Sequence, residues 1–154
     1  MKYLNYDIVF QEIPNETILA INITNCPNKC EGCHSTILRE DIGEVLTKEE
    51  MSKLLLKYGN QITCVCIMGG DSNISDIIEI ASFVKSWNEK KIKLGWYSGA
   101  SMLPEKFPLQ NFDYIKLGDY RKELGGLRSK NTNQRLYKII DSEKMIDITD
   151  LFWK

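Results

Sequence analysis

The sequence predicts an α/β fold, namely a partial (open) βα barrel of mainly parallel strands. Four short apolar runs stand out, each followed by glycine or polar residues: 18–24, 64–68, 93–97 and 114–117. Runs of this kind are typical of parallel strands that are buried on both faces. Helical patterns lie between some of them, and a strand–helix–strand order indicates right-handed crossovers. The chain has 154 residues, fewer than the roughly 250 usual for a closed eight-fold barrel, so we expect an open one.

The predicted elements follow one another along the chain. The first strand, 18–24, is rich in branched apolar residues and ends just before a cysteine-rich loop. Residues 47–50 have the form of a capping box, which predicts a helix from there to about Tyr58. A second helix is expected over 75–88, because its apolar residues fall on one helical stripe.

The carboxyl ends of the predicted strands carry glycine and polar residues. These are Asn25-Cys26, Gly69-Gly70-Asp71, Ser98-Gly99 and Gly118-Asp119. In open sheets of parallel strands, ligands bind beyond the carboxyl ends. The four strand ends therefore predict one common site.

Composition and charge narrow the class of protein. The chain is 43% hydrophobic and 27% charged, as in soluble globular proteins, and no repeat or linker divides it, so we expect a single domain, 1–154. The formal net charge of -1 gives no electrostatic reason to expect nucleic acid as a partner. Residues 1–10 lack the apolar stretch of a signal peptide, and no later segment suits a membrane span. The expected location is cytoplasmic.

Three of the five cysteines lie close together, at Cys26, Cys30 and Cys33. In a reducing compartment this pattern favours metal ligation or catalysis over disulfides. A short loop with this spacing can place three thiolates around three corners of a 4Fe–4S cluster. No fourth cysteine is nearby, so one iron is left open to an exogenous chelate, such as the amino and carboxylate groups of an amino-acid-like ligand.

Other interpretations of the cysteines remain open. A structural zinc site would use the three loop thiols and His34, although Cys33 and His34 are adjacent and cannot easily turn both side chains onto one small ion. Thiols that bind nothing are a further alternative, against which their crowding in a short chain argues. Cys64 and Cys66 alternate in a predicted strand, and we interpret them as buried thiols of the sheet core rather than as a redox pair.

The pattern C-x3-C-x2-C after a strand resembles the radical S-adenosylmethionine superfamily. The resemblance implies that Cys26, Cys30 and Cys33 hold three irons and act in catalysis through the cluster, whose fourth iron binds S-adenosyl-L-methionine. An electron from the cluster then splits the sulfonium and gives methionine and a 5′-deoxyadenosyl radical. The implied cofactor-binding residues are Gly32, Cys33, His34, Gly69, Gly70, Asp71 and Ser98.

The expected contributions of these residues differ. Gly69 and Gly70 allow bare backbone to approach a ligand, although two glycines also fit an ordinary turn after a strand. Asp71 stands where the superfamily more commonly has Glu. Ser98 either hydrogen-bonds the carboxylate of the cofactor or is a turn residue before glycine. His34, the sole histidine, either packs against the adenine or caps the loop.

Within that superfamily, nearly the whole chain resembles the activating proteins of anaerobic ribonucleoside-triphosphate reductases. The motifs are Cys30–His34, Met68–Asp71, Trp96–Gly99, Asp113–Gly118, Glu123–Ser129 and Asn131–Leu136. The resemblance implies a glycyl-radical activating enzyme, whose radical abstracts hydrogen from the α-carbon of a glycine in the reductase. The implied partners are the catalytic subunit of the reductase and a flavodoxin- or ferredoxin-type electron donor. The alternative within this class is a radical enzyme that acts on another protein or a small molecule.

Overall fold

The structure is a computed structural model that describes residues 1–33, 35–87 and 91–154. Eight strands in this part of the chain form one sheet, in the order β3-β1-β2-β4-β5-β6-β7-β8. The strands are β1 (Lys2–Val9), β2 (Ile18–Ile23), β3 (Glu44–Val45), β4 (Cys64–Met68), β5 (Lys93–Tyr97), β6 (Tyr114–Leu117), β7 (Arg135–Ile139) and β8 (Met145–Asp147). The helices are α1 (Lys48–Tyr58), α2 (Ile74–Ser86) and the short 3-10 helices η1 (Thr36–Arg39), η2 (Leu109–Asn111) and η3 (Thr149–Trp153).

The sheet is mixed rather than mainly parallel. Its centre consists of the parallel neighbours β2, β4, β5 and β6. On one side β1 and β3 extend it with antiparallel pairs, and on the other side β7 and β8 do the same. Antiparallel pairs thus outnumber parallel pairs by four to three, and the described residues contain two α-helices. The prediction of a partial βα barrel of mainly parallel strands is therefore wrong.

The outer strands explain this error. In β1 only Tyr3 is buried, and in β7 only Leu136 is buried, while their neighbours are partly or fully exposed. A search for unbroken apolar runs detects strands buried on both faces and misses strands with mixed side chains. Antiparallel neighbours also need no crossover helix, so no helical pattern precedes them.

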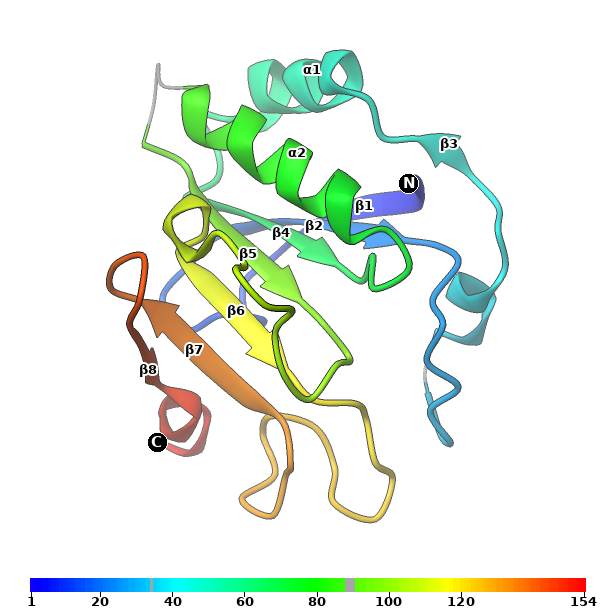
Figure 1. Ribbon diagram of the computed structural model, residues 1–154, viewed down its shortest axis with the longest axis vertical. Coiled ribbons are helices and arrows are strands. Elements are labelled where there is room, and N and C mark those ends of the chain that lie inside the picture. The colour runs from blue at the N-terminus through cyan, green and yellow to red at the C-terminus, as the bar shows by residue number, and fades with distance from the viewer. Residues whose placement is uncertain (34, 88–90) are drawn as a thin grey trace.

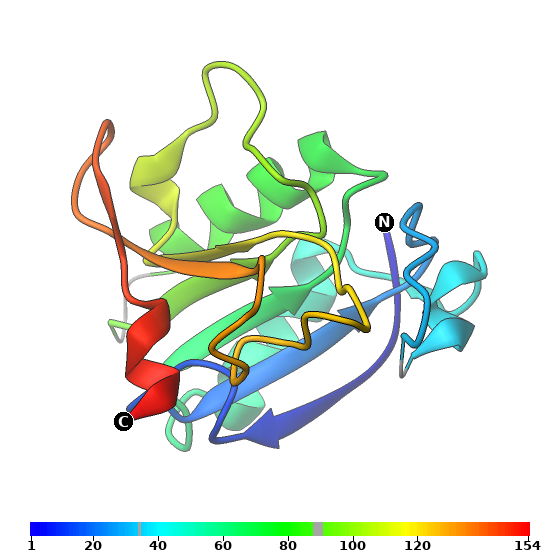
Figure 2. The same cartoon turned by 90° about the horizontal axis from the view of Figure 1, so that it is seen from below.

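The two faces of the sheet are covered differently. Helices α1 and α2 lie together on one face, where residues such as Met51 and Ile77 form a large core with the sheet (Figure 1). The opposite face carries a smaller core, with the segment after β6 and helix η3 packed on it through Leu127 and Phe152 (Figure 2). The residues of this smaller core are Ile13, Ile18, Ala20, Cys64, Cys66, Tyr114 and Leu136.

Several local predictions are confirmed. Strands β4, β5 and β6 have the expected bounds, and β2 is one residue shorter. Thr47 Oγ1 accepts a hydrogen bond from Glu50 N (3.1 Å), so the predicted cap of α1 is present. Helix α2 ends at Ser86, and Asn88, the predicted end, lies outside the described residues. Among the helices that are described, none is long and apolar enough to cross a membrane.

The thiols of β4 belong to the smaller core, as predicted. Cys64 and Cys66 are fully buried. Burial raises the pKa of both, because a thiolate is poorly solvated inside the sheet. Both residues therefore remain protonated thiols at neutral pH.

A buried carboxylate joins the amino ends of the parallel strands. Glu16, just before β2, accepts hydrogen bonds from Thr63 Oγ1 (2.9 Å), Lys93 Nζ (2.9 Å) and Tyr114 OH (2.8 Å). These three residues stand at the starts of β4, β5 and β6. Burial by itself would raise the pKa of Glu16, but the hydrogen bonds from Lys93, Tyr114 and Thr63 outweigh burial and lower it.

Candidate functional site

The carboxyl ends of β2, β4 and β5 meet at Asp71, which follows β4. Asp71 Oδ1 accepts a hydrogen bond from Ser98 Oγ (2.5 Å), just after β5. Asp71 Oδ2 accepts hydrogen bonds from Gly99 N (2.8 Å) and from Asn28 Nδ2 (2.8 Å), in the loop after β2. Figure 1 shows the three arrowheads pointing toward this edge of the sheet. The predicted meeting of these strand ends is confirmed, with one carboxylate at its centre.

Two glycines allow the segments to come this close. A Cβ on Gly99 would lie 2.3 Å from Asn28 Nδ2, so a side chain there would push the cysteine loop away from β5. Gly70 has a φ of +95°, and a Cβ there would lie 2.5 Å from Ile77 Cδ1. The chain therefore leaves β4 along a path that only glycine takes without strain, and this path carries Asp71 to the strand ends.

The cysteine loop, residues 25–40, is closed at its base. Asn25 N donates to Glu40 O (2.9 Å). Next to it, Cys26 N donates to Leu38 O (2.9 Å). Ser72 Oγ donates to Asn25 O (2.8 Å), which ties the start of the loop to the segment after β4. The base of the loop is thus closed on itself, and its first residue is tied to the segment after β4.

The three thiols of the loop are partly exposed and unbonded to one another. Cys33 N donates to Cys30 O (3.2 Å), and Cys33 Sγ accepts a weak hydrogen bond from Ser35 N (3.5 Å). Within the described residues, no three metal-ligating side chains converge on the position of a single ion. A 4Fe–4S cluster binds its thiolates on different irons, so its ligands surround a larger group than one ion. The zinc alternative requires His34, which lies outside the described residues.

Arg39, at the end of η1, reaches back across the cysteine loop to Cys30. Its Nη2 donates to Cys30 O (2.7 Å). Its Nε is buried and has no acceptor among the residues that the structure describes. Buried donors without a partner are rare in folded proteins, so this atom calls for an explanation.

Lys116 brings the end of the fourth parallel strand, β6, to the same site. It is only 8% exposed, and its Nζ donates to Ser98 O (3.0 Å) and Gly118 O (2.9 Å). Burial lowers the pKa of Lys116, while electrostatic interaction with Asp71 and Cys30 acts in the opposite direction. Lys116 therefore joins the ends of β5 and β6 and is close enough to the cysteine loop for Cys30 to act on its pKa.

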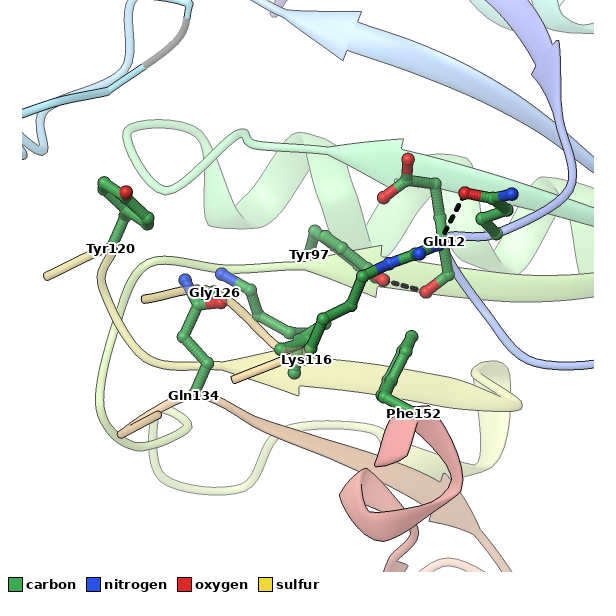
Figure 3. A pocket seen from close by; sticks show the side chains of 10 residues that line it. Glu12, Tyr97, Lys116, Tyr120, Gly126, Gln134 and Phe152 are labelled. Carbon is green, nitrogen blue, oxygen red and sulfur yellow. Dashed lines mark hydrogen bonds between the residues drawn. The ribbon is translucent and has the colours of Figure 1, made fainter. Parts of the chain in front are cut away.

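A pocket of about 460 Å³ opens beside Lys116 (Figure 3). Tyr97 and Lys116 line it from β5 and β6, while Gln134 and Phe152 come from the segments that pack on the smaller core. The Tyr97 hydroxyl donates to the backbone carbonyl of Glu12, and Lys116 Nζ lies 5.5 Å from the centre of the Tyr97 ring. Pockets of this volume are large enough for a small ligand or for the tip of a peptide loop.

The structure brings some predicted cofactor residues together and separates others. At the strand ends lie Gly69, Gly70, Asp71 and Ser98, while Gly32 and Cys33 lie on the loop. Ser98 is fully buried and donates its only hydroxyl proton to Asp71, so it positions that carboxylate. Gly32 is exposed, and its missing side chain would contact Lys122 at 3.4 Å. Contact of these residues with a cofactor stays a prediction, and His34 lies outside the described residues.

Sequence reasoning missed three residues of the site: Asn28, Arg39 and Lys116. Lys116 offered a signal, because it is the one charge in the apolar run 114–117 and a buried charge requires partners. Asn28 and Arg39 offered none beyond their nearness to the cysteines. Their contacts depend on how the loop folds back onto the sheet.

The model of one protein family, described as a 4Fe-4S single cluster domain, matches residues 17–136. The match covers most of the chain, including the three cysteines of the loop and all four parallel strands. No curated protein and no solved structure matches the chain.

Proposed function

We propose that this chain, which belongs to the family of 4Fe-4S single cluster domains, activates an anaerobic ribonucleoside-triphosphate reductase as a radical S-adenosyl-L-methionine enzyme. Cys26, Cys30 and Cys33 ligate three irons, and the fourth iron takes the cofactor. When bound, the cluster supplies one electron that cleaves S-adenosyl-L-methionine to methionine and a 5′-deoxyadenosyl radical, which takes a hydrogen atom from the α-carbon of a reductase glycine. The observation that carries the proposal is the meeting of cysteine loop and strand ends at Asp71.

The donor set of the chain fits a cluster with one open iron. Three thiols are partly exposed on one closed loop, whereas Cys64 and Cys66 are buried in the sheet. Thiolates are the ligand form of cysteine, and burial raises the pKa of these two thiols and so disfavours that form. Three ligands from the loop leave one iron for an outside ligand.

Asp71 is a positioning residue in this proposal. Its carboxylate holds Asn28 of the cysteine loop on one side and Ser98 and Gly99 of the β5 end on the other. A ligand that binds an iron on the loop and also contacts the strand ends needs a fixed distance between the loop and the sheet. In this proposal the hydrogen bonds of Asp71 fix that distance, and Asp71 does not contact the reacting atoms.

The backbone after β4 supports the binding of an ammonium group. Gly69 O accepts a hydrogen bond from Trp96 Nε1 (2.7 Å), and Gly70 O accepts one from Asn73 N (2.9 Å). A carbonyl oxygen has two lone pairs, so each can accept a second hydrogen bond. The amino group of S-adenosyl-L-methionine is a donor of the kind that these oxygens accept.

The partners follow from the same chemistry. The chain has five cysteines, three on the loop and two in the sheet, so none remain to bind a second cluster. The electron therefore comes from a separate flavodoxin- or ferredoxin-type donor. The pocket beside Lys116 is the expected entry for the glycine-bearing loop of the reductase.

The test is made without oxygen, on the full chain reconstituted with iron and sulfide. With dithionite and S-adenosyl-L-methionine, the protein without substitutions (the parent) is expected to release 5′-deoxyadenosine. With the reductase added, electron paramagnetic resonance should show a glycyl doublet that requires both reductant and cofactor. Cys30→Ser should abolish both products, because it removes a corner ligand of the cluster.

Two results would contradict the proposal. A colourless protein that binds zinc and releases no deoxyadenosine would identify a zinc-stabilised module instead. Deoxyadenosine released without a glycyl doublet would point to a radical enzyme with another target.

A further inference from the structure

The cysteine loop has a cation at its Cys30 corner whose hydrogen bonding is incomplete. Arg39 Nη2 donates to the Cys30 carbonyl oxygen (2.7 Å), and the buried Nε finds no acceptor within the described part of the chain. The five N–H donors of a guanidinium lie in one rigid plane, so the Nη2 bond also fixes where Nε lies. A buried N–H without an acceptor is unfavourable, and a bound group that accepts from it would remove that penalty.

Two further cations border the same loop. Lys116 Nζ is buried at the strand ends and interacts electrostatically with Cys30. The Lys122 side chain lies against Gly32. Of the three cations, Arg39 is the one that contacts the backbone of a loop cysteine and has a buried donor without an acceptor in the described residues. Arg39 is therefore the cation best placed to act on a group bound by the thiols.

We propose that Arg39 is a positioning residue of the cluster: its Nε–H donates to a sulfur at the Cys30 corner, while Nη2 holds the Cys30 carbonyl. This inference rests on the proposed function, because it assumes a cluster on the loop thiols. Ligands of metal sites are commonly oriented by partners of this kind. Hydrogen bonds to the sulfurs and nearby charge are also what set the reduction potential of a cluster.

The expected direction of the effect follows from charge. Reduction adds one electron and makes the cluster more negative. A positive guanidinium that donates to a sulfur stabilises the reduced state more than the oxidised state. Arg39 therefore raises the midpoint potential, which makes the cluster easier to reduce.

The experiment compares anaerobically reconstituted full-length parent with Arg39→Gln, Arg39→Lys and the control Arg121→Gln. Arg121 loses the same charge, but its Nε pairs with Asp119 Oδ1 (3.3 Å) and its side chain is 54% exposed. Iron per chain is measured first. The midpoint potential is then measured by redox titration monitored by electron paramagnetic resonance, and the rate of iron loss by adding a chelator.

We expect Arg39→Gln to shift the midpoint potential to a more negative value and to lose iron to the chelator faster than the parent. Arg39→Lys keeps the charge, but one ammonium cannot replace both donors, so its shift is expected to be smaller. Arg121→Gln should match the parent. Failure of Arg39→Gln to load iron at unchanged circular dichroism, with loading restored in Arg39→Lys, would also support the positioning role.

Equal midpoint potentials in the parent, Arg39→Gln and Arg121→Gln, all fully loaded, would overturn this inference and leave the proposed function intact. An equal shift in Arg39→Gln and Arg121→Gln would also overturn it, because the loss of one positive charge alone would then account for the effect. A parent that takes up no cluster would overturn the proposed function, and this inference with it.

Discussion

At the amino ends of the parallel strands, one buried carboxylate ties the sheet to itself. Glu16 accepts hydrogen bonds from Thr63, which directly precedes β4, and from Lys93 and Tyr114, the first residues of β5 and β6. Each partner belongs to the sheet or stands next to it. Glu16 is only 5% exposed, whereas the side chain of its partner Lys93 is 49% exposed, so the carboxylate is buried and solvent reaches the network at Lys93.

At the carboxyl ends, a second carboxylate ties the sheet to a loop. Asp71 accepts hydrogen bonds from Ser98 and Gly99 of the β5 end and from Asn28 of the cysteine loop. The loop that Asp71 holds carries three partly exposed thiols, and the Nε of its Arg39 lacks an acceptor in the described residues.

The difference teaches where stability and function reside in this fold. In the Glu16 network the four side chains bond to one another, so the role of this network is to fix the strand starts. The Asp71 network holds a loop whose ligand-forming groups remain available. Functional sites commonly leave such groups unpaired, and the rest of the fold provides the compensating stability.

The largest effect on stability is expected from Glu16→Gln. The substitution removes the charge that faces Lys93 and turns an amide N–H toward donors such as the hydroxyls of Thr63 and Tyr114. We expect the free energy of unfolding to fall by about 2–3 kcal/mol, measured by urea denaturation. The exposed Glu79→Gln on α2 is the control and should change it by less than about 0.5 kcal/mol. A loss no larger than that of the control would contradict the stabilising role of the Glu16 network.

Gly99→Ala tests the contact between β5 and the cysteine loop. The new methyl group would overlap Asn28 Nδ2, so the Asn28 side chain must shift and its hydrogen bond to Asp71 is disturbed. We expect a loss of about 1–3 kcal/mol in the free energy of unfolding, together with reduced iron uptake. In Gly126→Ala the methyl group meets Gln134 Oε1 at 3.8 Å, an ordinary contact, and unfolding should be unchanged. Equal behaviour of the two variants would contradict the close approach.

Asp71→Asn distinguishes the role of the carboxyl ends of the strands from that of the amino ends most clearly. It should lower the free energy of unfolding by only about 1–2 kcal/mol, because Asn28 and Gly99, two of its three partners, are partly exposed. Iron uptake and deoxyadenosine release should nevertheless fall about tenfold or more, whereas Glu16→Gln should retain both once folded. If Asp71→Asn kept full activity, Asp71 would have no positioning role.

The pH dependence of stability tests the contribution of the Glu16 carboxylate in a second way. Its pKa is lowered on folding, so the folded state binds its proton less readily than the unfolded state. Its contribution is therefore complete above the ordinary pKa of 4.5 and is lost as the pH falls through the lowered value. The stability difference between the parent and Glu16→Gln should shrink between about pH 5 and pH 3. A difference that stayed constant over this range would show that the pKa is not lowered.

The smallest effect is expected from Cys66→Ala. The thiol is buried in the smaller core and is no ligand in this account. We expect a loss of about 1 kcal/mol in stability and unchanged iron per chain. Iron lost from Cys66→Ala as completely as from Cys30→Ser would contradict the assignment of ligands to the loop.

The sequence allowed the central part of the fold to be predicted, because strands such as 64–68 are buried on both faces and read as continuous apolar runs. The outer strands could not be recognised in this way. In β1, polar residues such as Asn5 and Asp7 interrupt the apolar pattern, and pairing with β2 rather than composition makes the segment a strand. The wrong fold class follows from that omission.

The site was predictable where chemistry depends on spacing alone. The three cysteines and the strand-end Asp71 stood out in the sequence. Asn28 and Arg39 did not, because their contacts arise only when the loop turns back and Gly99 leaves room for it. Such contacts belong to tertiary structure and have no local pattern.

The most direct test of the central claim is the electron paramagnetic resonance spectrum of the reduced, reconstituted protein with and without S-adenosyl-L-methionine. If three thiolates hold the cluster and one iron is open, the cofactor binds that iron and the cluster signal changes in shape and position. The same change should be absent in Cys30→Ser. A cluster signal that is identical with and without the cofactor would contradict the account, because it would mean that no iron is open to it.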